Sequence, residues 1–412
     1  MKIHDIAVVG GGPAGCIAAI TAARLKKSVV LIEKNAGIGK KMLMTGKGRC
    51  NLTNSAPVET FVEKFGSVGK FLRTAFYNFS NEDLTEFFGG LGLELKTERQ
   101  GRIFPADDKA SSVVAALKKE LASSGVEVVY NSRTQSIKYG NGYFILNIAG
   151  GIVICAKKVV IACGGSSFKA TGSTGDGFEI AAKFGHKIVP LQPALVPLKT
   201  QETFVSQIQG LALKNLSIRF IIGKKRIVSP IGELMFTHFG VSGPLVLDLS
   251  GEIVPEIKAW GGIPLLIDLK PGLDTAKLEK KMLKEIKENC NMDIGNVMKG
   301  MLPQRLVPVF LQLASVAAGK KANQLSSAER RAIIDLLKGF PLTVENALPL
   351  EEGMVTNGGV LTSEIDPRTM ESKLVPGLYF AGEIIDGCAP SGGYNLQQAF
   401  STGKLAGEKA AL

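Results

Sequence analysis

The sequence predicts an α/β fold in which a Rossmann-type nucleotide-binding domain is interrupted by an insert. Three observations predict this fold. The first 33 residues follow the order strand, glycine-rich turn, helix, strand, which is typical of the start of such a domain. The middle of the chain changes to a β-rich and then to a helical pattern. Near residue 377 a strand that runs into a glycine turn returns, and such a late strand would close the first domain around the intervening residues.

The turn after the first strand carries glycines at the G-x-G-x-x-G spacing, in the run Gly10, Gly11, Gly12, Pro13, Ala14, Gly15. In this motif the first glycine permits the tight turn and the second lets a pyrophosphate approach the backbone. The third lets the helix pack closely on the strand. The amides at the start of the helix attract phosphates. The turn therefore predicts a dinucleotide site.

An acid ends the second strand. Glu33 lies 18 residues after Gly15, where its carboxylate can accept hydrogen bonds from a ribose. An acid at this place disfavours a 2′-phosphate. We therefore expect FAD or NAD rather than NADP.

The composition is that of a globular protein of more than one domain, with 412 residues, 45% apolar and 21% charged. A net charge of +12 allows an anionic partner such as RNA. The six cysteines show no C-x-x-C spacing, so we expect reduced thiols and a cytoplasmic location. We expect no membrane span and no metal site, because no apolar run and no ligand cluster has the required length or spacing.

The region between Glu33 and the insert alternates helices and strands. Helical patterns occur near 81–91 and 109–123, and the second leads into a strand at 126–130. A small antiparallel meander then interrupts the alternation. Its strands, and the buried strand that follows, are expected at 134–139, 143–148, 152–155 and 159–162.

Three prolines within eight residues, Pro190, Pro193 and Pro197, mark the start of the insert. The insert contains 20 basic and 14 acidic residues, so it holds +6 of the net charge. Its basic residues include the groups Lys224-Lys225-Arg226, Lys280-Lys281, Lys320-Lys321 and Arg330-Arg331. The expected division is a first nucleotide-binding segment, a β-rich part, a helical part and a closing segment, at 1–193, 194–272, 273–345 and 346–412.

The whole chain resembles the BaiN/RdsA-like family of bacterial NAD(P)/FAD-dependent oxidoreductases, which includes an aminoacetone oxidase. Five stretches carry the resemblance: VVGGGPAG at 8–15, KKMLMTGKGRCNLTN at 40–54, GRIFP at 101–105, GELMFTHFGVSGP at 232–244 and VTNGGVLTSEIDPRTMESKLVPGLYFAGEIIDGCAPSGGYNLQQAFSTG at 355–403. The resemblance implies a glutathione-reductase-like FAD domain, and an insert with a β-barrel part and a helical part.

The expected cofactor is therefore FAD. Basic side chains of the loop after the second strand can neutralise a pyrophosphate or an anionic reduced flavin. Glu383 and Asp386 resemble the acids that hold a ribityl chain, and the helix starting near Tyr394 can stabilise negative charge on the flavin ring. The expected FAD site comprises Gly10, Gly12, Pro13, Ala14, Gly15, Glu33, Lys34, Lys40, Lys41, Arg49, Cys50, Asn51, Gly164, Gly382, Glu383, Asp386, Gly393, Tyr394, Asn395 and Leu396.

The sequence leaves the catalytic acid or base open. Cys50, His238 and Tyr394 are candidates. No second cysteine is spaced as a redox partner of Cys50, so dithiol chemistry is not expected. His238 is one of three histidines, and a lone histidine is more often structural than catalytic.

The resemblance implies hydride transfer from flavin N5 to an activated C=C bond, because two family members reduce a bile-acid enone and a uracil ring in ribosomal RNA. The basic charge favours uridine in ribosomal RNA, with dihydrouridine as product. An enone reductase, an aminoacetone-like amine oxidase and a non-catalytic RNA-binding flavoprotein are the alternatives. The chain has one dinucleotide fingerprint, so NAD(P)H would dock only transiently.

Overall fold

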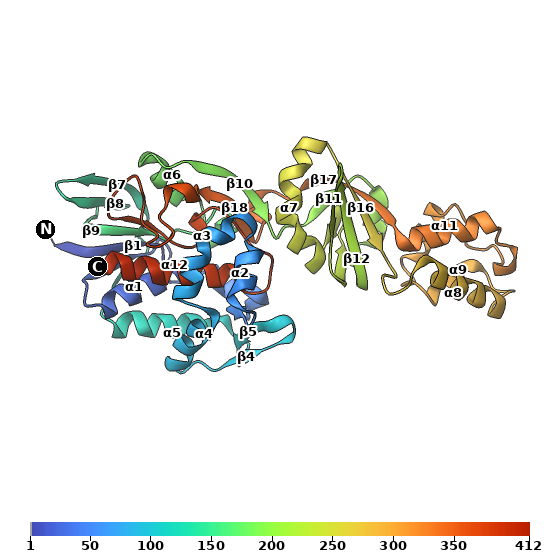
Figure 1. The fold of residues 1–412 in the computed structure, drawn as a ribbon, viewed down its shortest axis with the longest axis horizontal. Coiled ribbons are helices and arrows are strands. Elements are labelled where there is room, and N and C mark those ends of the chain that lie inside the picture. The colour runs from blue at the N-terminus through green and yellow to red at the C-terminus, as the bar shows by residue number, and fades with distance from the viewer. Residues whose placement is uncertain (1) are drawn as a thin grey trace. The chain divides into compact units, whose positions relative to one another are not determined.

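The computed structural model describes residues 2–412 and divides them between two units (Figure 1). Unit 1 is formed by the chain up to Ala194 together with Pro349–Leu412, and unit 2 is Leu195–Leu348. Unit 1 is thus built from two stretches that are far apart in the sequence. Unit 2 is the stretch of chain between them.

The central sheet of unit 1 has the order β6-β2-β1-β9-β8-β7, with β19 also paired to β9. Strands β6, β2, β1, β9 and β19 run parallel, and β7 and β8 form an antiparallel meander. The strands are β1 (Ile3–Val9), β2 (Val29–Ile32), β6 (Glu127–Val129), β7 (Thr134–Gly140), β8 (Tyr143–Ile148), β9 (Val153–Ile161) and β19 (Leu378–Phe380). The C-terminal stretch therefore adds a strand to the sheet begun by the N-terminal one, and the Rossmann-type fold is confirmed.

The sequence prediction divided β9 into two strands and was wrong there. Lys157 and Lys158 break the apolar pattern, but the strand is continuous because both of its edges are hydrogen-bonded. Its first half pairs with β8, and nearly all of it pairs with β1. The Lys157 side chain lies outside the core and pairs with Asp5 (2.9 Å).

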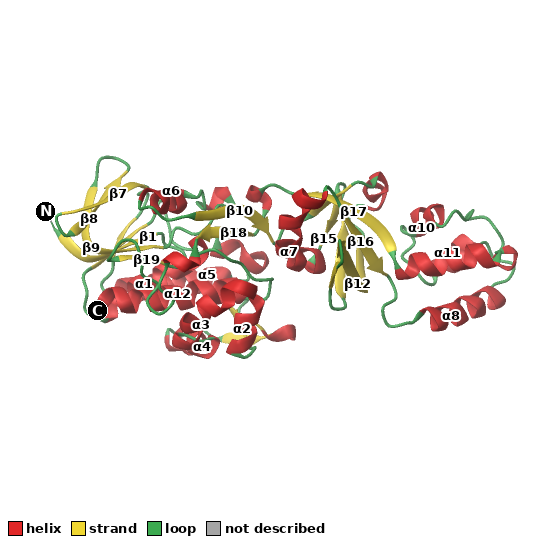
Figure 2. Ribbon diagram, turned by 45° about the horizontal axis from the view of Figure 1, so that its top comes forward, coloured by secondary structure: helices red, strands yellow, loops and turns green. Residues whose placement is uncertain are grey.

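Two helices with small residues at their contact form the centre of unit 1. Helix α1 (Pro13–Arg24) packs along α12 (Tyr394–Ala411), as Figure 2 also shows. A Cβ added at Gly403 would lie 2.3 Å from the carbonyl oxygen of Ala14, and one at Gly407 would lie 2.5 Å from that of Ala18. The helix backbones approach this closely only because α12 carries no side chain at these two positions.

The rest of unit 1 consists of helices and two small sheets. Strands β3 (Thr53–Asn54), β5 (Arg102–Pro105) and β4 (Leu95–Thr97) form one sheet, and β10 (Ile188–Ala194) and β18 (Val355–Val360) form the other. The helices are α2 (Val58–Lys64), α3 (Gly69–Asn78), α4 (Asn81–Gly90), α5 (Ala110–Ser123) and α6 (Asp176–Lys183).

Unit 2 contains a closed barrel. Its ring of strands runs β12-β14-β15-β11-β17-β16 and closes because β12 pairs with both β14 and β16. Strand β13 extends β12 as a hairpin. The strands are β11 (Leu198–Thr200), β12 (Ala212–Ile222), β13 (Lys225–Val228), β14 (Gly232–Phe236), β15 (Gly240–Ser242), β16 (Ile263–Asp268) and β17 (Phe340–Ala347).

Helices accompany the barrel in unit 2. Helix α7 (Pro244–Trp260) packs against β12, β14 and β17. Between β16 and β17 the chain forms α8 (Thr275–Glu288), α9 (Ile294–Lys299), α10 (Val307–Leu313) and α11 (Ser327–Lys338). One apolar core runs through barrel and helices. Among residues 2–412, no helix is long and apolar enough to cross a bilayer, and no histidine, cysteine and acid side chains are grouped to hold a metal ion.

The contact of α1 with α12 generates a stability prediction. Gly407→Ala should lower the free energy of unfolding by roughly 1–3 kcal/mol, because its Cβ must displace backbone. Gly89→Ala is the matched control, since a Cβ at this exposed position of α4 meets nothing within 4 Å. It should stabilise by up to about 1 kcal/mol through helix propensity. Denaturant unfolding measures both, and equal effects in the two variants would contradict the packing argument.

Candidate cofactor-binding site

The glycines of the β1–α1 turn have different surroundings. Gly10 adopts φ +109°, and a Cβ there would lie 2.4 Å from the carbonyl oxygen of Ala162. A Cβ at Gly15 would lie 1.8 Å from the carbonyl oxygen of Gly10. A Cβ at Gly12, by contrast, meets nothing within 4 Å. Gly10 and Gly15 thus make close packing possible, whereas Gly12 borders open space at the start of α1.

Glu33 follows β2 and is held by backbone and side-chain donors. One carboxylate oxygen accepts from the Gly11 N–H (2.7 Å), and the other accepts from the backbone and side-chain amides of Asn35 (2.7 Å each). Glu33 is only 6% exposed, yet it lines the pocket. Its carboxylate is therefore fixed in place and has lone pairs left for a ligand hydroxyl.

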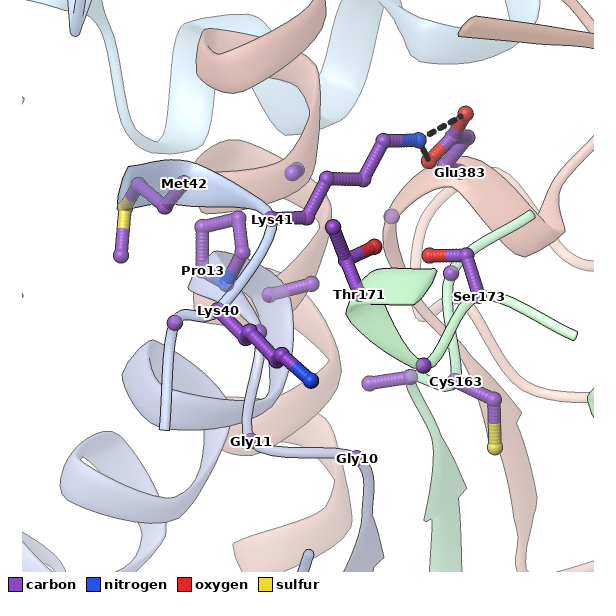
Figure 3. Close-up of a pocket in the computed structure, with 18 of the residues that line it drawn as sticks. Gly10, Gly11, Pro13, Lys40, Lys41, Met42, Cys163, Thr171, Ser173 and Glu383 are labelled. Atoms are coloured by element: carbon purple, nitrogen blue, oxygen red, sulfur yellow. Dashed lines mark hydrogen bonds and ion pairs between the residues drawn. The ribbon is translucent and has the colours of Figure 1, made fainter. Parts of the chain in front are cut away.

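A pocket in unit 1 lies beside this turn and is formed by several distant segments (Figure 3). The turn, the loop after β2, the loop after β9 and the start of α12 all contribute. Of the expected site, the residues that line it are Gly10, Gly12, Pro13, Ala14, Glu33, Lys34, Lys40, Lys41, Gly164, Gly382, Glu383, Asn395 and Leu396. The pocket thus extends from Glu33, the acid expected to bind a ribose, to the N-terminus of α12.

An ion pair lines the pocket away from the turn. Lys41 Nζ lies 2.7 and 2.9 Å from the two carboxylate oxygens of Glu383, and Figure 3 shows this contact. Lys41 also donates to Ser167 Oγ (2.8 Å), and Glu383 accepts from the Thr356 N–H (2.8 Å). The expected positive charge of Lys41 is therefore compensated, and the pair orients Glu383 in the pocket wall.

The charges at the ribose end are also paired. Lys34 Nζ contacts Asp176 (2.9 Å) and Thr174 (2.6 Å), and Arg133 contacts Asp176 (2.8 Å). Burial opposes ionisation of Asp176, but its hydrogen bonds with Lys34 and Arg133 outweigh burial and hold its pKa below the ordinary value. Lys40 lines the pocket without an ion-pair partner among residues 2–412. Lys40 is therefore the lysine best placed to neutralise a phosphate.

The structure places the other expected residues outside the pocket lining. They are Gly15, Arg49, Cys50, Asn51, Asp386, Gly393 and Tyr394. Arg49 forms ion pairs with Glu98 and Asp108, and its guanidinium lies 4.1 Å from the centre of the Phe104 ring. With its amide oriented to satisfy its neighbours, Asn51 accepts from the Gly393 N–H (3.0 Å). Arg49 and Asn51 therefore hold the loop after β2 in place.

None of the three candidates for a catalytic acid or base lines the pocket. Cys50 is fully buried, which raises the pKa of its thiol to about 12. Tyr394 is buried edge-on against Phe61, with ring centres 5.0 Å apart. His238 is exposed between β14 and β15 in unit 2. Asp386 is half-buried, and burial raises the pKa of its carboxyl.

Sequence reasoning missed several residues at the pocket. Ser167 and Thr356 hold the Lys41–Glu383 pair, and the only signal for Thr356 was its place in the last stretch of the resemblance. The glycine-rich run at 172–177 is also expected at the site from the sequence, and Gly172, Ser173 and Asp176 line the pocket, but no pattern in the sequence indicates that Asp176 pairs with Lys34. Thr134 borders the pocket, and its buried hydroxyl has no hydrogen-bond partner among the described residues.

These residues fit a bound FAD. The open space at Gly12 admits a pyrophosphate, and Glu33 can accept from a ribose. The start of α12 brings Asn395 and Leu396 to the pocket, where helix amides favour negative charge.

Fold and pocket together define a Rossmann-type protein whose pocket fits FAD. Its family and a full-length relative make its class that of the FAD-dependent oxidoreductases. Over residues 4–409 the chain matches the family model described as HI0933-like protein Rossmann domain, and it belongs to that family. The resemblance identified from the sequence is thereby confirmed.

Two relatives match nearly the whole chain. A protein of Clostridium scindens named 3-dehydro-bile acid delta(4,6)-reductase is 33% identical over 411 residues, which cover 99% of each chain. The ribosomal RNA dihydrouridine synthase of Escherichia coli is 31% identical over 405 residues, 98% of this chain and 96% of that one. Both relatives carry the names of enzymes.

Solved structures of low sequence identity share the fold. The open conformation of a flavocytochrome c3 fumarate reductase covers the whole chain with a TM-score of 0.54 at 18% identity, and 78% of that chain is matched. A 3-ketosteroid delta1-dehydrogenase from Sterolibacterium denitrificans gives 0.55 at 14% identity, with both chains fully covered.

The open position at Gly12 generates a cofactor-binding prediction. Gly12→Val should leave the protein folded but reduce its FAD content at least about tenfold, because the side chain would fill the space needed by the pyrophosphate. Gly37→Val is the control, since its Cβ also meets nothing within 4 Å but it does not line the pocket. Flavin absorbance and thermal unfolding of the purified variants measure the two effects. A Gly12→Val protein with full flavin content would contradict this assignment.

Proposed function

We propose that the protein reduces an activated C=C bond of its substrate. Two relatives that align over nearly the whole chain carry the proposal. Their names give different substrates but the same type of reaction, the reduction of a C=C bond. A delta(4,6)-reductase of a 3-dehydro steroid acts on double bonds conjugated to a carbonyl. Dihydrouridine forms when the uracil double bond beside a carbonyl is saturated. Bound FAD, after reduction by an external donor, would supply a hydride from its N5 atom, and a proton would complete the saturation of the bond.

The residues of the pocket support this reaction by binding and orienting. Glu33 would hold the ribose, and Gly12 and the first amides of α1 would hold the phosphates. Lys41 and Ser167 would position Glu383 against the cofactor. The N-terminus of α12 would stabilise negative charge at its end of the pocket.

We propose uridine in ribosomal RNA as the substrate. The name of the relative from Escherichia coli supports RNA, as does the net charge of +6 in the insert. A base inside a folded RNA must leave its stack to reach a flavin, and a macromolecular substrate then needs a contact surface outside the pocket. A steroid-like enone is the second candidate, because the relative from Clostridium scindens is equally complete and 33% identical.

The substrate prediction is tested on ribosomal RNA from a strain that lacks the gene. Purified FAD-loaded protein with a reductant, without oxygen, should convert a uridine of this RNA to dihydrouridine, seen by nucleoside mass spectrometry as a gain of two hydrogens. The FAD-depleted Gly12→Val variant is the control. Unchanged RNA together with rapid reduction of a 3-oxo-Δ4 steroid would favour the enone. Peroxide formed from aminoacetone in air would favour the oxidase.

The electron donor gives a separate prediction. Among the described residues, one sheet carries a Rossmann-type glycine turn, so NADH or NADPH should meet the flavin only by transient docking. The rate of flavin reduction should then rise linearly with the concentration of NADH or NADPH. It should not saturate below about 1 mM, which is the upper end of the usual range of KM values. Stopped-flow absorbance without oxygen measures this rate. Saturation at low micromolar donor would show a dedicated nicotinamide site.

A further inference from the structure

The chain has one tryptophan, and it lies on the surface of unit 2. Trp260 ends α7 and is 54% exposed, although a large aromatic side chain is usually buried. One edge of its ring rests on the turn between β12 and β13. A Cβ added at Gly223, where φ is +56°, would lie only 2.6 Å from the indole Cη2 atom. The turn therefore packs against one edge of the ring, and about half of the residue stays exposed to solvent.

The same turn carries three consecutive cations. Lys224, Lys225 and Arg226 are all exposed and have no ion-pair partner within residues 2–412. The pairing of Ile222 with Lys225 closes the hairpin, so the cations follow directly on the glycine that touches Trp260. We name residues 223–226 the 223–226 tip. Its three unpaired cations therefore lie beside the exposed ring of Trp260.

Three of the paired basic residues singled out in the helical part form ion pairs, and a fourth is hydrogen-bonded to backbone. Lys320 pairs with Glu329 (2.7 Å), Lys321 with Asp293 (2.8 Å) and Arg331 with Asp335 (3.1 Å). Arg330 donates to the carbonyl oxygen of Leu325 (2.7 Å). These groups therefore serve the local structure of the helical part. The exposed pair Lys280 and Lys281 of α8 has no ion-pair partner in the described chain, but it has no exposed tryptophan beside it.

We propose that Trp260 and the 223–226 tip form a docking surface for an unpaired segment of the RNA substrate. The indole stacks on a base, and the three cations contact neighbouring phosphates. Stacking on aromatic side chains beside basic groups is the usual way in which proteins bind single-stranded nucleic acid. This proposal depends on one part of the proposed function, namely that the substrate is RNA. It adds the surface on which the protein holds that RNA.

The single tryptophan makes the surface directly observable. FAD-loaded protein is titrated at low salt with a short unstructured oligouridylate, while tryptophan fluorescence and the anisotropy of labelled RNA are recorded. Both signals should change together and saturate at the same concentration. Trp260→Ala should weaken binding roughly tenfold, and Trp260→Phe should retain most of it. Tyr139→Ala removes an aromatic residue of similar exposure from unit 1 and should change nothing.

The cations are tested by salt dependence. The triple variant Lys224→Gln, Lys225→Gln, Arg226→Gln should lower the slope of log affinity against log salt by about 2, since each phosphate contact on a single strand contributes roughly 0.7. The double variant Lys280→Gln, Lys281→Gln is the control and should leave the tryptophan signal unchanged. Flavin content and thermal unfolding confirm that each variant is folded.

The possible failures are distinguishable. Binding by anisotropy without a tryptophan signal would place the RNA elsewhere and overturn the proposal. Absence of RNA binding, with a tryptophan signal on phosphatidylserine vesicles, would identify a membrane surface instead. If the triple variant formed dihydrouridine as fast as the parent protein at limiting RNA, the docking surface would be wrong while the proposed function stood. If RNA bound at Trp260 but no dihydrouridine formed, the proposed function would fail and the surface would remain.

Discussion

The close backbone contact of helix α1 with its surroundings is the constraint on which the rest of unit 1 depends. Gly15 places α1 against the carbonyl of Gly10, and Gly403 and Gly407 place α12 against α1 at Ala14 and Ala18. Because no side chain of these glycines separates the backbones, the N-terminus of α1 and that of α12 are fixed relative to each other. The pocket lies along these two helix starts, so its electrostatics follow from packing of the backbone.

Charge in the pocket is mostly arranged in pairs. Glu33 is held by amides, Glu383 by Lys41, and Asp176 by Lys34 and Arg133. Such pairs hold polar groups in fixed positions before a ligand arrives, which lowers the entropy lost on binding. Lys40 is the one pocket lysine without an ion-pair partner among the described residues. Little net positive charge therefore remains in the pocket to attract a phosphate by long-range electrostatics. Recognition of a dinucleotide then depends on shape and on directed hydrogen bonds.

The same distinction between paired and unpaired charge applies to the insert. Its net charge of +6 is a property of composition, but ion pairs neutralise much of the helical part. On the barrel, three consecutive exposed cations without an ion-pair partner among the described residues lie at the tip of one hairpin, beside an exposed indole. A partner would therefore meet a small patch of combined aromatic and basic character on the barrel.

The sequence alone determined the fold class, the cofactor class and the family, because these depend on local signals. A glycine turn between strand and helix, an acid at Glu33 and a long matching stretch near the C-terminus can each be read within a few dozen residues. Most of the residues that the sequence assigned to the cofactor site also line the pocket. It could not show that Lys41 pairs with Glu383, which is 342 residues away, or that Arg49 turns from the pocket to Glu98 and Asp108. Only the tertiary structure decided these contacts, and the exposure of Trp260, since the partner of a charged or aromatic side chain is set by chain segments that meet only after folding.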